Sequence, residues 1–355
     1  MTLFLQADKS LKLPKLSEKV SGAVLQLDFR DNTFKRSGSD AALSTLIEKT
    51  SQGVGGKYDA YGTWEQVVQY GLDVSVDQQT FNRGLLIEAP FANLFLNSKT
   101  PVTQTISITV AAVTEAFILS VAGTGSVEIK IGSKSFGTAS YQKPLVLYGS
   151  DITIGTFDAV LTVTGTLSYV GFYRTVQAVE RVARVTTVGN LVTRVGDVVK
   201  INQAVLNTLL TNFTGCIVVK NYIPNDIFDR SKTNAQSGSI IQVKNTAHKG
   251  YFVARQENGP MTNLLRRIDA TEKIEQTGTQ LSSSNVYALN FNPASAKLAH
   301  NGSLSNELTL TGVTLSDIFI GSGDNWSTVI SNYIQEVLLF DRNLTDQELI
   351  AISSL

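Results

Sequence analysis

The clearest alternation of apolar and polar positions lies between residue 317 and the C-terminus. Residues 317–320 predict a strand that ends at Gly321. Residues 334–340 are apolar with one charge, Glu336, which suits a buried strand and is short for a helix. Thr345 then opens a capping box with Glu348 ahead of Leu349. The closing segment therefore predicts a strand, a polar loop, a second strand and a short helix.

Further short strand patterns precede this segment. They are predicted at residues 216–220, 239–244, 250–255, 286–291 and 297–300. Between the last of these and the next strand, Asn301-Gly302 favours a type I′ hairpin turn. A hairpin is also expected over residues 182–195, turning at Gly189-Asn190. Residues from about 200 onward thus predict a β sandwich.

Two other regions precede this sandwich. Residues 101–175 carry about six short strand patterns separated by glycine-containing turns, which predicts a compact β sandwich. Residues 1–100 are less regular: strands are expected at 24–29 and 83–88, a short helix at 41–49 and a loop at 51–56. This region has few long periodic segments, so we expect it to fold by packing onto something else.

The closing segment resembles the end of concanavalin A-like (laminin-G-like) lectin jelly rolls. The resemblance rests on the Asn301-Gly302 hairpin, the strand at 317–321, and an Asp341-Arg342 pair followed by Leu-Thr-x-x-Glu-Leu at 344–349. It implies a mainly β chain with a C-terminal concanavalin A-like jelly roll over residues 176–355, including its leading hairpin. It says nothing about the ligand.

A second resemblance lies nearer the N-terminus. Leu27-Asp-Phe29, then Arg-Gly-Leu-Leu-Ile-Glu at 83–88, resemble the N-terminal region of tailed-bacteriophage virion proteins, although Phe91-Ala92 replace the usual Arg-Thr. It implies that residues 1–100 dock to other virion proteins. Residues 101–175 would be a small carbohydrate-binding-module-like sandwich, or a spacer that binds no ligand. Homotrimers are common among such proteins.

The amino-acid composition argues against several classes of binding partner. Lys plus Arg and Asp plus Glu both number 30 in 355 residues, so no net charge attracts nucleic acid or an acidic membrane. The single Cys216 excludes disulfides within the chain, and two histidines argue against a histidine-rich metal site. No apolar run reaches the roughly 18 residues of a membrane span, and no secretory signal is evident. We expect synthesis in a host bacterial cytoplasm, no membrane insertion and no cofactor.

The sequence contains no recognisable set of catalytic residues. Glycosidases on this fold need two carboxylates that flank the scissile bond. Glu336 stands alone in its strand, and Glu272 and Glu275, three apart in a polar stretch, suit a solvated turn or helix face. Nucleophile-elbow and phosphate-loop motifs are absent. We therefore predict no enzyme, no catalytic residue and no metal.

Sugar binding needs only an aromatic face and a few polar groups. Asp324, Asn325 and Trp326 share a glycine-rich loop, and Tyr222 and Asp226 form a second candidate set. Two alternatives stay open. Trp326 can close the end of the sandwich while Asp324 caps the turn, or Asp324 can bind Ca²⁺, which normally takes several oxygen ligands.

The hypothesis is a structural protein on the surface of a phage particle, as a tail fibre, spike or head fibre. It would adhere to host-surface polysaccharide through many weak contacts. The alternatives are a capsid decoration protein with a purely stabilising role and a polysaccharide-degrading enzyme.

Overall fold

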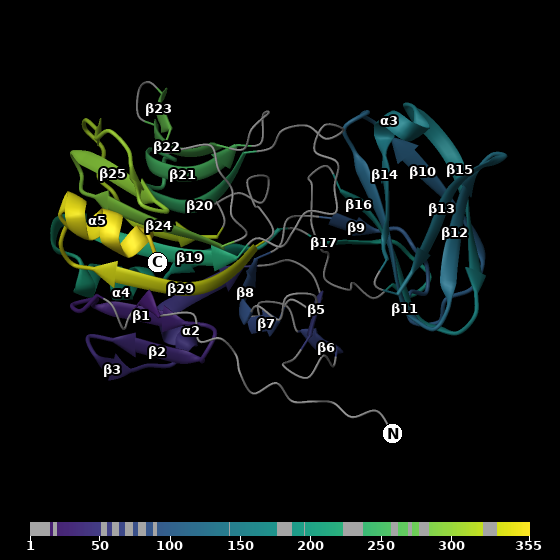
Figure 1. Cartoon of the computed structure of the whole chain (residues 1–355), viewed down its shortest axis with the longest axis horizontal. Helices are drawn as coiled ribbons and strands as arrows, with labels where there is room; N and C mark the ends of the chain where they lie inside the picture. The colour runs from purple at the N-terminus through teal and green to yellow at the C-terminus, as the bar shows by residue number, and fades with distance from the viewer. Residues whose placement is uncertain are drawn as a thin grey trace.

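The structure is a computed structural model of the chain. It describes residues 15–16, 20–50, 55–58, 64–67, 74–76, 83–87, 91–141, 143–175, 187–194, 196–222, 237–256, 262–268, 272–276, 284–321 and 332–355. The predicted fold class is confirmed: the chain is mainly β, with antiparallel sheets stacked as sandwiches. Figure 1 shows a larger sandwich on the left, which carries both the earliest described strands and the C-terminus, and a smaller one on the right.

The larger sandwich consists of two sheets, named here sheet A and sheet B. Across sheet A the order is β26 (Ser303–Leu304), β25 (Ser295–His300), β24 (Ser284–Phe291), β19 (Gly215–Tyr222), β29 (Asn332–Phe340), β1 (Leu25–Asp28), β2 (Thr33–Arg36) and β3 (Ser39–Asp40). In addition, β27 (Leu308–Thr309) pairs with β25, β8 (Arg83–Ile87) with β29, and β7 (Val74–Val76) with β8. Sheet B runs β23 (Glu272–Gln276), β22 (Thr262–Ile268), β21 (Gly250–Gln256), β20 (Ser237–Lys244), β28 (Asp317–Ile320), β18 (Val198–Ile201) and β4 (Ile47–Thr50).

Strand β29 is central in sheet A because both of its edges pair with other strands. One edge pairs with β19, and the other pairs with β1 along residues 336–339 and with β8 along residues 332–334. In sheet B, β4 pairs with β18. The early strands β1, β4 and β8 are thus hydrogen-bonded into the same sandwich as the C-terminal strands. The domain boundaries expected from the sequence stay a prediction.

The two faces of sheet A are buried differently. Its inner face packs on sheet B, through residues such as Leu27, Tyr287 and Val337 against Val243 and Ile318. Its outer face carries a second apolar cluster. Leu349 and Ile352 of helix α5 (Asp346–Ser353) cover that cluster, and the helix lies across this face in Figure 1. Both faces of β19 and β29 are buried, which suits their apolar runs at residues 216–219 and 337–340.

The local signals in the closing segment are confirmed. Thr345 and Glu348 form the reciprocal capping box at the start of α5. Asn301 and Gly302 both have positive φ, 44° and 82°, as a type I′ turn requires. The turn is pinned further because the Val286 amide donates to Asn301 Oδ1 at 2.9 Å.

Several local predictions were wrong. The helix expected over 41–49 is a single turn, α2 (Leu43–Leu46), and residues 47–50 form β4 because they pair with β18. Gly55 and Gly56, expected in a loop, begin β5 (Gly55–Tyr58), which pairs with β6 (Trp64–Val67). Glu272 and Glu275, expected on a turn or helix, lie in β23.

The smaller sandwich also has two layers. The four-stranded layer runs β10 (Gln104–Val110), β15 (Gly155–Thr164), β12 (Ser126–Ile131) and β13 (Lys134–Ser140). The other runs β14 (Leu145–Tyr148), β11 (Ala116–Gly123), β16 (Leu167–Thr175), β9 (Phe91–Asn93) and β17 (Val192–Arg194). Its core holds Phe117 stacked on Phe172, with ring centroids 5.8 Å apart. Strand β17, expected in the leading hairpin of the jelly roll, pairs here with β9; its expected partner residues, 182–186, lie outside the described residues.

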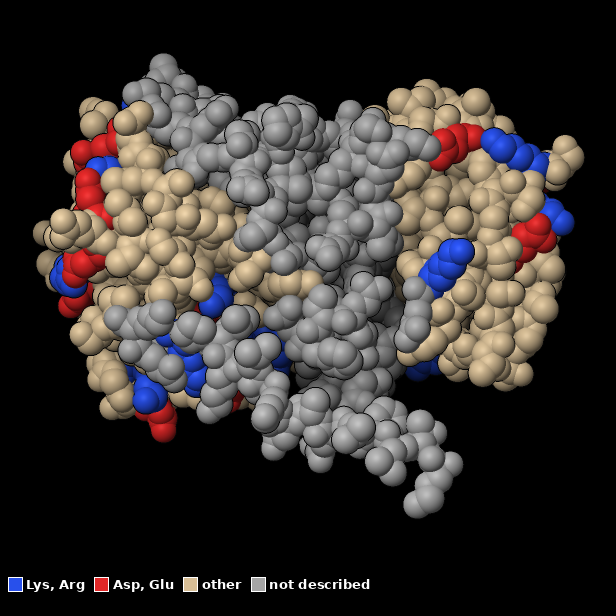
Figure 2. All heavy atoms as spheres, viewed as in Figure 1, with Lys and Arg blue, Asp and Glu red and all other residues tan. Residues whose placement is uncertain are grey.

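Three short helical segments complete the described structure: α3 (Gly149–Ile152), α4 (Gln203–Leu209) and a 3₁₀ turn at Thr211–Phe213. Across the described part of the face in Figure 2, acidic and basic side chains are interspersed over both sandwiches. In the described portion of the chain, no helix has the length and apolar character to cross a membrane.

Candidate functional site

Four of the five predicted glycan-binding residues, Asp226, Asp324, Asn325 and Trp326, lie outside the described residues. The structure does describe strand ends that border their segments. Tyr222 is the last residue of β19, directly before residues 223–236. Asn332 is the first residue of β29, directly after residues 322–331.

These strand ends are adjacent. Tyr222 and Tyr333 are cross-strand partners in sheet A, and their ring centroids lie 6.3 Å apart. Both side chains are buried, so Tyr222 forms part of the base from which the two segments leave. Direct sugar contact by Tyr222 stays a prediction. The structure thus places the start of the first candidate segment and the end of the second at one end of the larger sandwich, named here the loop end.

The segment that contains Trp326 is closed at its base. Asn332 Nδ2 donates to the Gly321 carbonyl oxygen at 3.2 Å, which joins the residue after the segment to the residue before it. Gly321 has a φ of +68°, and a Cβ there would come within 2.7 Å of Ile87 Cγ1. The glycine ahead of the predicted loop is therefore required both by its backbone conformation and by close packing.

The sandwich interior becomes polar toward the loop end. Asn221, Asn285 and Asn332 are fully buried there. His300 Nε2 lies 3.1 Å from Asn285 Oδ1, and burial lowers the pKa of His300 to about 4, so the ring is neutral near pH 7. Asn221 makes no side-chain hydrogen bond in the structure, although burying an unpaired amide is costly.

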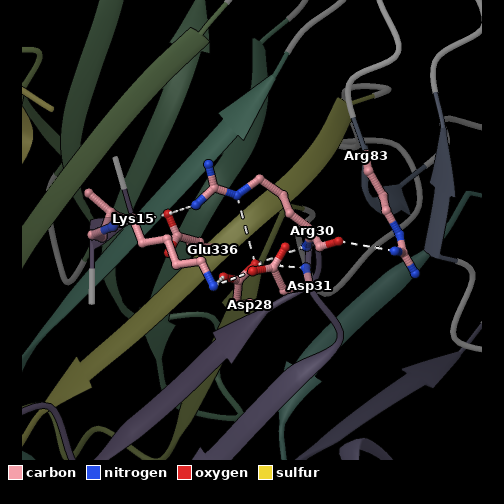
Figure 3. A network of polar contacts seen from close by, with 7 residues as sticks. Lys15, Asp28, Arg30, Asp31, Arg83 and Glu336 are labelled. Carbon is pink, nitrogen blue, oxygen red and sulfur yellow. Dashed lines mark hydrogen bonds and ion pairs between the residues drawn. The ribbon is translucent and has the colours of Figure 1, made fainter. Parts of the chain in front are cut away.

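A second polar site lies on the outer face of sheet A (Figure 3). Asp28 of β1 and Glu336 of β29 are directly opposite each other across the two strands. Arg30 joins them: its Nη2 lies 2.7 Å from Glu336 Oε2, and its Nε lies 3.7 Å from Asp28 Oδ1. Lys15 forms ion pairs with Asp28, at 3.4 Å, and with Asp31. We call this group the charge network.

Hydrogen bonds tie two more chain segments to the charge network. The Leu16 amide donates to Glu336 Oε2 at 3.2 Å, which fastens the N-terminal segment to β29. Arg83 Nη1 donates to the Arg30 carbonyl oxygen at 3.0 Å, as Figure 3 shows. The arginine of the Arg-Gly-Leu-Leu-Ile-Glu phrase therefore contacts the turn after β1.

Burial dominates the electrostatics of Glu336. Its side chain is 1% exposed, and this desolvation raises the carboxyl pKa above its ordinary value. The Arg30 guanidinium and the Leu16 amide favour the ionised form and oppose the shift, while Asp28 adds to it. Glu336 Oε1 accepts no hydrogen bond in the structure.

Asp28 and Glu336 are two facing carboxylates, so they invite comparison with the carboxylate pair of a glycosidase. Both are paired with Arg30, and their side chains are 9% and 1% exposed. A substrate-cleaving acid must reach the scissile bond, and these two are held in ion pairs instead. Their visible geometry suits holding chain segments together.

The remaining candidate groups are placed as follows. Cys216 is fully buried, and burial raises the pKa of its thiol strongly. His248 lies in the turn after β20, where its Nδ1 is 3.5 Å from Lys244 Nζ. Among the described residues, no group of three or more acidic, histidine or cysteine side chains is placed to bind a metal ion.

Sequence reasoning missed the charge network, although one signal pointed to it. A lone charge inside an apolar strand, as at Glu336, needs a buried partner. The alternation in residues 24–29 placed Asp28 on the face opposite to Leu27, so it was a candidate partner. The pairing of β1 with β29 was not expected, so the two acids were not connected.

No protein-family model matches the chain, and no curated protein matches it. Among solved structures, it is similar to the CBM40 domain of the Ruminococcus gnavus IT-sialidase bound to α2,6-sialyllactose, with 16% identity, 39% of this chain and 82% of that chain covered, and a TM-score of 0.31. It is also similar to the binding domain of botulinum neurotoxin DC in complex with rat synaptotagmin II, with 15% identity, 44% and 39% coverage, and a TM-score of 0.32. At these identities and TM-scores neither likeness carries an argument about ligand or activity.

Proposed function

We propose that the chain is a structural protein of a tailed-phage particle whose concanavalin A-like lectin sandwich adheres to host-surface glycans through the loop end. The observation that carries the adhesive role is the pairing of Tyr222 with Tyr333. The segment with Asp226 begins after Tyr222, and the segment with Trp326 ends just before β29, so both have one end beside this pair. In this proposal the two predicted sets of sugar-binding residues serve one surface.

The virion role rests on the sequence resemblance at residues 27–29 and 83–98, and the lectin fold rests on the resemblance at residues 301–349. In this proposal residues 1–100 contact other virion proteins, and the protein assembles as a homotrimer on the virion surface. Three copies, each with a weak glycan site, adhere firmly because linked sites raise the effective concentration of each other. Asp324 and Asn325 hydrogen-bond sugar hydroxyls while Trp326 stacks on the ring.

Glycan-array binding of the intact protein tests the loop end. The variant Trp326→Ala should lose binding, since stacking on an aromatic ring contributes much of the affinity for a pyranose. Tyr141→Ala is the matched control, because Tyr141 is an aromatic residue of the smaller sandwich that is 58% exposed. Equal binding by Trp326→Ala and the wild type would refute the loop-end site.

Particle location separates the proposal from its alternatives. Antibody labelling of purified particles should mark fibres or spikes. A label confined to the capsid surface, with no glycan bound on the array, would instead favour a purely stabilising decoration protein. Release of reducing ends from host polysaccharide by the purified chain would favour a degrading enzyme.

A further inference from the structure

The smaller sandwich has a long edge strand with one side unpaired. Strand β10 lies at the edge of the four-stranded layer, where it pairs with β15 on one side, and no described strand pairs along its other side. In an antiparallel ladder, alternate residues bond to the neighbouring strand, and the residues between them direct their N–H and C=O groups outward. The unpaired side of β10 therefore presents backbone donors and acceptors that can bond to a further strand.

Strand β10 lacks the features that normally protect an edge strand. Its seven residues include no charged residue, proline or glycine. They keep one continuous register with β15, so no bulge bends the strand away from a partner. Every other described edge strand has four residues or fewer, or carries a charged residue. The short ones are β3, β4, β5, β6, β7, β14, β17, β26 and β27, and the longer, charged ones are β13 and β23.

The side chains of β10 alternate between the two faces of the layer. Ile106 and Ile108 are 7% and 1% exposed and lie in the core. Thr105, Ser107 and Thr109 are exposed on the other face. These five residues read Thr-Ile-Ser-Ile-Thr, the same sequence in both directions. An antiparallel copy centred on Ser107 therefore places Thr opposite Thr on one face and Ile opposite Ile on the other, and such β-branched pairs stabilise antiparallel strands.

Charge does not oppose this pairing. Asp158 of β15 is the residue opposite Ser107 within the layer. In the paired state the two copies of Asp158 are three strand spacings apart, about 14 Å, which exceeds the screening length of about 8 Å at physiological salt. Strand β10 itself offers a partner no charge to recognise. The match of residues 105–109 with themselves is therefore the recognition feature that the strand contains, and it selects a second copy.

We propose that β10 is an interface between two copies of the chain, which pair antiparallel through residues 104–110 about a two-fold axis at Ser107. The two four-stranded layers then form one continuous sheet. A two-fold contact cannot lie within a three-fold ring, so it joins chains of different trimers and is additional to the assembly proposed above. With one strand per copy the interface is small, and we expect a dissociation constant on the order of 100 μM.

Disulfide trapping tests this interface, because a covalent bond captures a weak complex. The native Cys216 is fully buried and does not compete. In Ser107→Cys the two thiols are directly opposite each other, with Cβ atoms about 4.5–5.5 Å apart, which is close to disulfide geometry. Under mild oxidation at about 100 μM protein, a covalent dimer should form about tenfold faster than in Asp158→Cys, because pairing raises the effective thiol concentration. Asp158→Cys is the matched control, an exposed position on the neighbouring strand.

The variants Thr105→Cys and Thr109→Cys test the register. About the Ser107 axis, residue 105 of one copy faces residue 109 of the other, while the two residues 105 are about 13 Å apart along the strands. A mixture of the two variants should therefore cross-link, and Thr105→Cys alone should not.

The proposal is overturned if Ser107→Cys forms a dimer no faster than Asp158→Cys. It is also overturned if Thr105→Cys alone cross-links as fast as the mixture, as parallel or unregistered pairing would produce. Neither readout depends on glycan binding or on trimer formation, so a failure of this interface is distinguishable from a failure of the proposed function.

Discussion

Glu336 and Glu348 lie on consecutive elements, β29 and α5, but their carboxyl pKa values shift in opposite directions. Burial raises the pKa of Glu336. At Glu348, Arg342 bonds both carboxylate oxygens, at 2.7 and 3.1 Å, and with the Thr345 amide lowers the pKa to about 2. The raised pKa of Glu336 stabilises the fold fully below the unfolded value near 4.5, and that contribution is lost as the pH rises through the folded pKa. The lowered pKa of Glu348 does the reverse.

The variants Glu336→Gln and Glu348→Gln should therefore respond to pH with opposite sign. The free energy of unfolding of the wild type, minus that of Glu336→Gln, should increase as the pH falls from neutral toward 4.5. For Glu348→Gln the same difference should decrease as the pH falls from 4.5 toward about 2, and by less, because Glu348 is solvent-screened. Urea unfolding over this pH range measures both, and a common sign would contradict the assignment.

At the scale of elements, Gly84 allows β8 to lie against β29. A Cβ at this position would be 2.7 Å from the Ile334 carbonyl oxygen and 3.0 Å from Tyr333 Cβ. Gly84→Ala should force the strands apart and destabilise the fold by about 1–3 kcal/mol, the usual cost of overpacking. Hydrogen–deuterium exchange should show faster amide exchange across residues 83–87 and 332–334. Ser107→Ala, on an exposed strand face, is the control, and unchanged protection in Gly84→Ala would refute the close approach.

The elements predicted well from sequence are those whose signals are local. The Thr345–Glu348 capping box and the Asn301-Gly302 turn depend on residues within a few positions of each other. The charge network depends on contacts such as Leu16 to Glu336, 320 residues apart, which leave no periodic trace. Likewise, the helix expected over 41–49 gave way to β4, because pairing with β18 outweighed a weak local propensity.

In the candidate site, too, local features could be predicted from the sequence and long-range contacts could not. The sequence identified the two polar segments around Asp226 and Trp326 from their composition. It did not show that the first segment begins, and the second ends, at neighbouring strand ends, because this depends on Tyr222 pairing with Tyr333 across the sheet.

At the scale of the whole molecule, residues 25–50 link any docking role to folding. The proposed virion contact involves residues 1–100, yet β1 and β4 are strands of the larger sandwich. Variants designed to disrupt docking must therefore leave these strands intact. Otherwise a failure to assemble on the particle would only report an unfolded sandwich.

Deleting residues 1–50 should unfold the larger sandwich and spare the smaller one. The deletion removes Leu25, Leu27, Phe29, Leu46 and Ile47 from the core between sheets A and B. Each buried side chain of this kind contributes about 1.5–3 kcal/mol, so together they match the 5–15 kcal/mol stability of a typical domain.

The core of the smaller sandwich lies within residues 95–172 and loses no side chain in this deletion. Calorimetry should show two cooperative transitions for the full chain and one for the deletion variant, and exchange protection in the variant should persist only in the smaller sandwich. Deletion of residues 1–14 should leave both transitions, since β1 and β4 remain. Two transitions in the longer deletion would mean that the C-terminal strands close the larger sandwich without the N-terminal ones.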